Sequence, residues 1–161
     1  MLEEWIKENV EMREDGKIAV VNDEVRILPP RAFSGMPLEK VILPHELRKI
    51  GAYSFAECSS LEVVNIPPQV VLIDDAAFCG CSSLRALTIP DKVVGLGAMT
   101  FAGTGLSRLD VPKSVRYIDN GAFANCDELK KITLPSEFYD IPYERWGYLF
   151  VPDPNISMPT Y

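Results

Sequence analysis

The chain has 161 residues, of which 47% are hydrophobic and 24% are charged, and its formal net charge at pH 7 is -7. This acidic balance argues against a general role in binding nucleic acids or anionic membranes, because either partner needs a basic face. The longest uninterrupted aliphatic run, Val70 to Ile73, is far shorter than the roughly 20 residues that a membrane-spanning helix needs. The composition predicts a soluble single domain with one hydrophobic core.

The start of the chain is expected to form an N-terminal cap. Four apolar residues recur there at helical spacing, which predicts an amphipathic helix: Leu2, Trp5, Ile6 and Val10. A turn is predicted at Glu14 to Gly16, and a strand is predicted over residues 17–21. Alignment with the regular repeats places Ile18 and Val20 opposite Val41 and Leu43. Residues 1–26 are therefore interpreted as a capping helix and a degraded first coil.

A repeat of 22 to 23 residues follows over residues 27–141. Five phenylalanines mark its period: Phe33, Phe55, Phe78, Phe101 and Phe123. A leucine column keeps the same phase: Leu38, Leu61, Leu84, Leu106 and Leu129. A proline column does so as well: Pro44, Pro67, Pro90, Pro112 and Pro135. A period of this size predicts a stacked solenoid, because a single coil cannot bury its own apolar side chains.

Each repeat divides into three short segments, and the best copy runs from Leu61 to Leu84. Alternation at Val64 and Ile66 predicts a strand with both side chains inward. Pro67 ends this strand, since a proline cannot donate to a strand ladder. A second, looser stretch is expected on another side of the coil. The alanine before Phe78 then begins a predicted helical turn that directs the aromatic ring into the core.

These units resemble the BspA-type leucine-rich repeats. The hallmark of that family, IPxxVxxIGxxAFxxCxxL, is represented here by IPPQVVLIDDAAFCGCSSL from Ile66 to Leu84. Some copies are degenerate, since Met36 and Thr104 replace the repeat cysteine. The resemblance implies an α/β leucine-rich-repeat right-handed solenoid, strand-rich with short helical turns, of about five repeats with atypical caps. It also implies bacterial surface or secreted relatives that act in adhesion, host interaction or protein recognition, and no catalytic residues.

Residues 142–161 are expected to form a C-terminal cap and tail. Trp146 lies 23 residues after Phe123, which places it in phase with the aromatic column. Such an aromatic end covers the open core of a solenoid, and it is also a candidate dimer contact. The alternative function is therefore a structural or self-assembling spacer module, associating as a weak homodimer through Trp146, Tyr148 and Phe150. Without that association the protein is expected to be a monomer.

The compartment depends on whether the chain has been processed. Its first residues, MLEEWIKENVEMRE, are acidic and amphipathic, and they lack the positive and apolar regions of a secretory signal. As written, the chain is therefore predicted to be cytoplasmic. The family resemblance favours the cell surface or secretion, which a removed signal peptide would explain.

The cysteines and aspartates do not form a predicted metal site. Three cysteines share one inward column, three residues after a column phenylalanine: Cys58, Cys81 and Cys126. We interpret them as small buried core residues. Cys79 pairs with Cys81, but no second pair or nearby histidine completes a zinc site. The turns at Asp74 and Asp119 fall two coils apart, about 10 Å, which is too far for one calcium ion. No metal and no cofactor are predicted.

No enzymatic activity is predicted either. His45 is the only histidine, and its position directly after Pro44 predicts a solvated turn residue. A nucleophile motif such as GxSxG is absent from the sequence. A deep polar pocket that contains His45 would revive the enzyme alternative.

The outer face of the strand ladder is the surface that a solenoid commonly uses for binding. Its outward columns are acidic and apolar near the first coils and basic near the last. The predicted protein-docking strip consists of Ile42, Val63, Asn65, Ala86, Thr88, Arg108 and Asp110. The predicted function is a non-catalytic protein-binding repeat scaffold, whose partner is a protein that the sequence does not identify. The alternative for this surface is an ordinary solvated sheet face.

Overall fold

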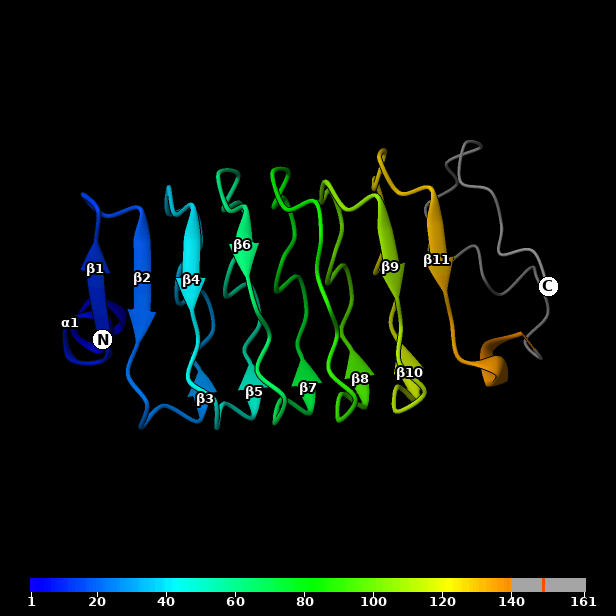
Figure 1. The fold of residues 1–161 in the computed structure, drawn as a ribbon, viewed down its shortest axis with the longest axis horizontal. Helices are drawn as coiled ribbons and strands as arrows, with labels where there is room; N and C mark the ends of the chain where they lie inside the picture. The colour runs from blue at the N-terminus through cyan, green and yellow to red at the C-terminus, as the bar shows by residue number, and fades with distance from the viewer. Residues whose placement is uncertain (140–148, 150–161) are drawn as a thin grey trace.

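The computed structural model describes residues 1–139 and Leu149, and they form a stacked solenoid (Figure 1). The coils follow one another along the long axis, so segments one repeat apart in the sequence lie side by side. Most coils pass through a strand on one side, a second short strand on the other, and a turn segment that carries the column phenylalanine; the coil at residues 85–89 lacks the first of these strands. The predicted strand-rich solenoid is confirmed.

The first end of the solenoid is covered by an element that the repeats lack. It comprises helix α1 (Leu2–Asn9), strand β1 (Val10–Arg13) and strand β2 (Ile18–Val21). Strands β1 and β2 pair antiparallel, and the half-buried Trp5 of α1 packs edge-on against Phe33 with ring centroids 6.4 Å apart. Val10, which was expected on the helix, begins β1 instead. This end therefore has both a helical and a strand cover.

The register of β2 differs from the expected one. Ala19, and not Ile18, lies opposite Val41 in the parallel pairing of β2 with the next strand. Ala19 and Val21 are buried, whereas Ile18 and Val20 are only half-buried. The alignment of Ile18 and Val20 with inward residues was wrong by one position, and a shift of one residue exchanges the two faces of a strand. The small Ala19 occupies the inward position.

The outward surface of the strand ladder is called the strand face below. Beyond β2 its strands are β4 (Lys40–Ile42), β6 (Val63–Val64), β9 (Arg108–Asp110) and β11 (Lys131–Thr133). They belong to two separate sheets, one of order β1-β2-β4-β6 and one that pairs β9 with β11. Inward residues are buried and their neighbours exposed, as the period-2 pattern predicts. The strand ladder is thus interrupted between β6 and β9.

The sheet on the other side of the coils, called the second sheet below, is continuous. Its strands are β3 (Ile27–Leu28), β5 (Lys49–Ile50), β7 (Leu72–Ile73), β8 (Gly95–Leu96) and β10 (Tyr117–Ile118). All its pairings are parallel, in the order β10-β8-β7-β5-β3. The second residue of each strand is buried. This sheet is the second, looser stretch that the sequence predicts.

The turn segments join the coils through a third set of hydrogen bonds. The amide of a column phenylalanine donates to the carbonyl of the residue that precedes the phenylalanine of the next coil. Examples are the bonds from Phe55 to Ala77 at 2.8 Å and from Phe78 to Thr100 at 2.9 Å. The residues two before and two after each phenylalanine have positive φ, as at Tyr53 (58°) and Glu57 (59°). With these left-handed residues on both sides of the phenylalanine, every second amide of the segment points to the next coil. The amides between them close turns within their own coil.

The core is a single column of stacked rings surrounded by aliphatic side chains. Phe78 lies between Phe55 and Phe101, with ring centroids 5.1 and 5.7 Å away and interplanar angles of 14° and 11°. The thiol of Cys58 donates to the Phe33 carbonyl at 3.0 Å, and Cys81 and Cys126 make the equivalent bond to the coil before them. All three cysteines are buried and free. Their interpretation as core residues is confirmed.

Two coils are one residue shorter than the others, and the missing residue lies between the phenylalanine and the following leucine. In the shorter Phe101 coil this connection contains Gly105. A Cβ atom at Gly105 would lie 2.4 Å from the Ser82 carbonyl oxygen of the preceding coil. The tight connection therefore depends on glycine.

The described chain ends with the 3-10 helix η1 (Ser136–Phe138), apart from Leu149. The buried Leu149 accepts a hydrogen bond of 3.0 Å from the Phe123 amide, so it continues the ladder of the turn segments. Trp146, Tyr148 and Phe150, the predicted self-association residues, lie outside the described residues.

Candidate protein-binding face

The predicted docking strip divides into two groups. Ile42 and Val63 are 39% and 43% exposed on the adjacent strands β4 and β6, and Asn65 is exposed directly after β6. These three residues lie on one side of the interruption in the strand ladder. Ala86 and Thr88 lie at the interruption itself, and Arg108 and Asp110 lie on the strand beyond it; these four residues line one hollow. The sequence predicts one continuous strip, whereas the structure shows two neighbouring patches.

The interruption lies at residues 85–89, where the third regular repeat should contribute a strand. Within the part of the chain that the structure describes, no backbone amide or carbonyl of these five residues is hydrogen bonded to a neighbouring coil. The turn segment of the same coil keeps its bonds, including the one from Phe78 to Thr100. The coil is thus held on two sides and open on the strand face.

A hollow of about 250 Å³ lies at this opening, and we call it the slot. It is lined by Arg85, Ala86, Leu87 and Thr88 and by Ser107, Arg108 and Asp110. Four of the seven residues of the predicted strip thus line one hollow. Leu87 lies one repeat after Val64, for which an inward side chain is expected, and its residue type gives no sign of a different role, so sequence reasoning missed its part in the slot.

Charge on the wall of the slot is partly compensated. Arg108 and Asp110 form an exposed ion pair at 3.1 Å. The Thr133 hydroxyl and, next, Arg108 lower the pKa of the Asp110 carboxyl. No carboxylate of the described chain pairs with Arg85. The lining of the slot, with two arginines and one aspartate, therefore carries an excess of positive charge, although the whole chain is acidic.

The second sheet exposes apolar side chains that the sequence analysis did not select. Ile27, Val71, Val94 and Tyr117 are 57%, 39%, 43% and 49% exposed. The Tyr117 ring lies over the backbone of Gly95, where a Cβ atom would come within 2.0 Å of it. The signal for this surface was present in the sequence, since Val71 and Val94 occupy one outward column.

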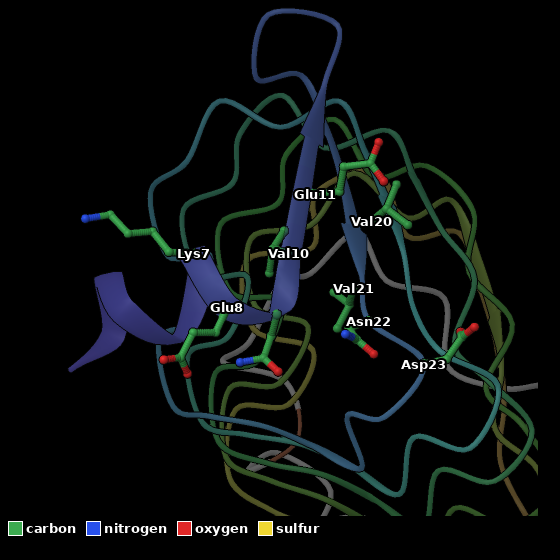
Figure 2. Close-up of a pocket in the computed structure, with 9 residues that line it drawn as sticks. Lys7, Glu8, Val10, Glu11, Val20, Val21, Asn22 and Asp23 are labelled. Carbon is green, nitrogen blue, oxygen red and sulfur yellow. The ribbon is translucent and has the colours of Figure 1, made fainter.

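Another hollow, of about 600 Å³, lies where α1 meets β1 and β2 (Figure 2). It is lined by Lys7, Glu8, Asn9, Val10, Glu11, Val20, Val21, Asn22 and Asp23. Figure 2 shows Lys7 and Asp23 on opposite sides, with their charged ends directed away from each other. The lining combines three carboxylates, those of Glu8, Glu11 and Asp23, with the ammonium group of Lys7. The Glu11 carboxylate is paired with Arg13 outside the hollow.

The remaining candidate groups are the histidine and the possible metal ligands. The exposed His45 lies 2.9 Å from a carboxylate oxygen of Glu46, and this contact lowers the pKa of Glu46. Among residues 1–139 and Leu149, no three metal-ligating side chains form a cluster. In that same part of the chain, no helix has the length and hydropathy to cross a membrane.

Solved structures share this fold. A leucine-rich repeat protein from Bacteroides ovatus is 25% identical, with a TM-score of 0.66 over 80% of this chain and 40% of its own. The T. pallidum leucine-rich repeat protein is 22% identical, with a TM-score of 0.64 over 80% of each chain. A leucine-rich repeat protein from Eubacterium ventriosum is 17% identical, with a TM-score of 0.62, and covers 82% of this chain and 43% of its own. The chain spans less than half the length of two of these proteins.

A search of curated protein sequences finds no match. The sequence profile of the BspA type leucine rich repeat region matches in six copies over residues 22–148. Leucine-rich repeat families usually serve as protein-binding scaffolds and are usually non-catalytic, and this match indicates no enzyme family. The repeats, the coil geometry and this match together place the chain in the BspA-type leucine-rich repeat family.

Proposed function

We propose that this protein is a non-catalytic scaffold that binds a protein partner through its strand face. The observation that carries the proposal is the slot, where the strand ladder is interrupted and four residues of the predicted strip meet. Exposed apolar residues on β4 and β6 and charged residues on β9 flank it. Apolar centres with charged surroundings are a common composition for protein interfaces.

The test is a comparison of two valines with equal exposure on opposite sheets. Val63 on the strand face and Val94 beside the second sheet are both 43% exposed. A photo-crosslinking amino acid at Val63 is expected to give a covalent adduct of defined mass in the cells that make the protein, whereas one at Val94 is not. Arg108→Glu in the Val63 crosslinking protein is expected to reduce the adduct about tenfold, because charge reversal next to a contact repels the partner.

Two outcomes would contradict the proposal. An equal or stronger adduct from Val94 would assign binding to the second sheet. A lack of adducts from Val63, while circular dichroism shows the fold unchanged, would contradict a protein partner at the strand face.

A further inference from the structure

The slot has the hydrogen-bonding character of an open sheet edge in the middle of a solenoid. Along residues 85–89, the backbone groups that elsewhere join neighbouring coils have no partner in the described chain. On the following strands the ladder is closed again, as the Val111 amide donates to the Thr133 carbonyl at 2.8 Å. Unpaired strand backbone is a template for another strand. The slot therefore offers main-chain donors and acceptors to an extended segment.

Leu87 gives the slot an apolar floor. Its equivalents on the four other coils, Val41, Val64, Leu109 and Ile132, are 2%, 4%, 1% and 4% exposed. Leu87 alone in this column is only half-buried, and it lines the slot. Its partial exposure and its place in the lining leave it accessible from the slot. An apolar side chain of a ligand would complete the burial that the neighbouring coils give to their own residues.

Positive charge lies along the same wall. Arg85 is exposed, and no carboxylate of residues 1–139 pairs with it. Arg108 lies on β9, and Lys131 is its partner residue on β11. Asp110 is the one acidic side chain that lines the slot, and Arg108 and Thr133 already engage it. The charge that fits this wall is therefore negative.

We propose that the slot binds an extended peptide segment of a partner protein, with an apolar side chain over Leu87 and a carboxylate beside Arg85 and Arg108. This inference rests on the proposed function and names the chemistry of its partner. The peptide backbone pairs with the unpaired groups of residues 85–89, as in other cases of strand addition to a sheet. Alternation of side chains along the peptide directs every second one toward the apolar floor.

The experiment uses synthetic peptides and the whole protein. The probe is acetyl-Val-Glu-Val-Glu-Val-Glu-amide, and backbone amide shifts are followed by NMR during titration to millimolar concentration. We expect the largest shifts at residues 85–89 and on β9, together with slower hydrogen exchange of the amides in 85–89. The same peptide with N-methylated valines is expected to bind at least about tenfold more weakly, because it has lost main-chain donors.

Reversing the charge of Arg85 provides an independent test. Arg85→Glu is expected to weaken binding of the glutamate peptide about tenfold and to favour the peptide in which lysine replaces glutamate. The matched control is Arg48→Glu, an exposed arginine that directly precedes β5 of the second sheet. We expect this control to leave the affinity unchanged. Neither arginine is buried, so both variants should fold.

The outcomes separate this inference from the function on which it rests. Equal binding of the N-methylated peptide, shifts centred on the second sheet, or no binding at millimolar concentration would each overturn the strand-addition proposal. If crosslinking at Val63 still captured a partner, the strand face would remain the binding surface and only the peptide mode would be wrong. If both experiments failed, the proposed function would fail as well.

Discussion

Replacing Phe78 by alanine is expected to lower the free energy of unfolding by about 3–5 kcal/mol. The Phe78 ring is fully buried and stacks on Phe55 and Phe101, so its loss removes apolar burial, leaves a cavity and breaks two ring contacts. Native domains have a total stability of about 5–15 kcal/mol, so the loss is up to a third of the upper value and most of the lower one. Urea unfolding, followed by far-UV circular dichroism and tryptophan fluorescence, measures the change.

The control for this variant is Tyr53→Ala. Tyr53 is an exposed aromatic residue on the next turn segment toward the N-terminus, and its ring contacts the Arg31 guanidinium at 4.6 Å. Its loss is expected to cost less than about 1 kcal/mol. Equal effects of the two substitutions would mean that the aromatic column does not determine stability. Divergence of the two spectroscopic probes would indicate that the coils at the two ends unfold separately.

The protein is expected to lose stability above about pH 9, because its core holds protonated thiols. Burial raises the pKa of Cys58 from 9.0 to about 11, and it also raises the pKa of Cys81 and Cys126. A thiol with a higher pKa in the folded chain stabilises the fold at low pH. That stabilisation is lost as the pH rises from the pKa of the thiol in the unfolded chain through its pKa in the folded chain. For Cys58 alone, the two units between these values correspond to about 2.7 kcal/mol.

The measurement is the difference between wild type and Cys58→Ala in urea unfolding under reducing conditions from pH 8 to pH 10.5. We expect the stability advantage of wild type to shrink by about 1.4 kcal/mol for each pH unit above 9. Parallel curves for the two proteins would show that the Cys58 thiol is not held in its protonated form.

The sequence was most informative where one position recurs in every coil. The column of Cys58, Cys81 and Cys126 was assigned to the core from its spacing alone, and the structure confirms it. The structure adds a hydrogen bond from each thiol to the preceding coil, which spacing does not show. The repeat can be recognised in the sequence because burial favours the same kind of side chain at the same position of every coil. The partner of a polar atom depends on backbone geometry, which the period does not contain.

The sequence was less informative where a single coil departs from the average. Leu87 matches its column in residue type, yet it is the member that remains half-buried. The alignment of Ile18 with Val41 was wrong by one residue, since Ala19 holds the inward position. In both cases neighbouring coils decide the exposure, and a residue type records only its own preference.

The sequence by itself determined that the chain is a leucine-rich repeat solenoid, which apolar columns form the core, and that the strand face is a candidate binding surface. The stacked solenoid and its core columns follow from periodicity, because a coil that cannot bury its own apolar side chains must stack on similar coils. The leucine-rich-repeat type follows from the family resemblance, and the choice of the strand face follows from the common use of that face by solenoids. Only the tertiary structure revealed the interruption at residues 85–89 and the antiparallel strand β1 that accompanies the predicted capping helix. These features depend on how closely adjacent backbones approach one another, and that distance is set by contacts between coils.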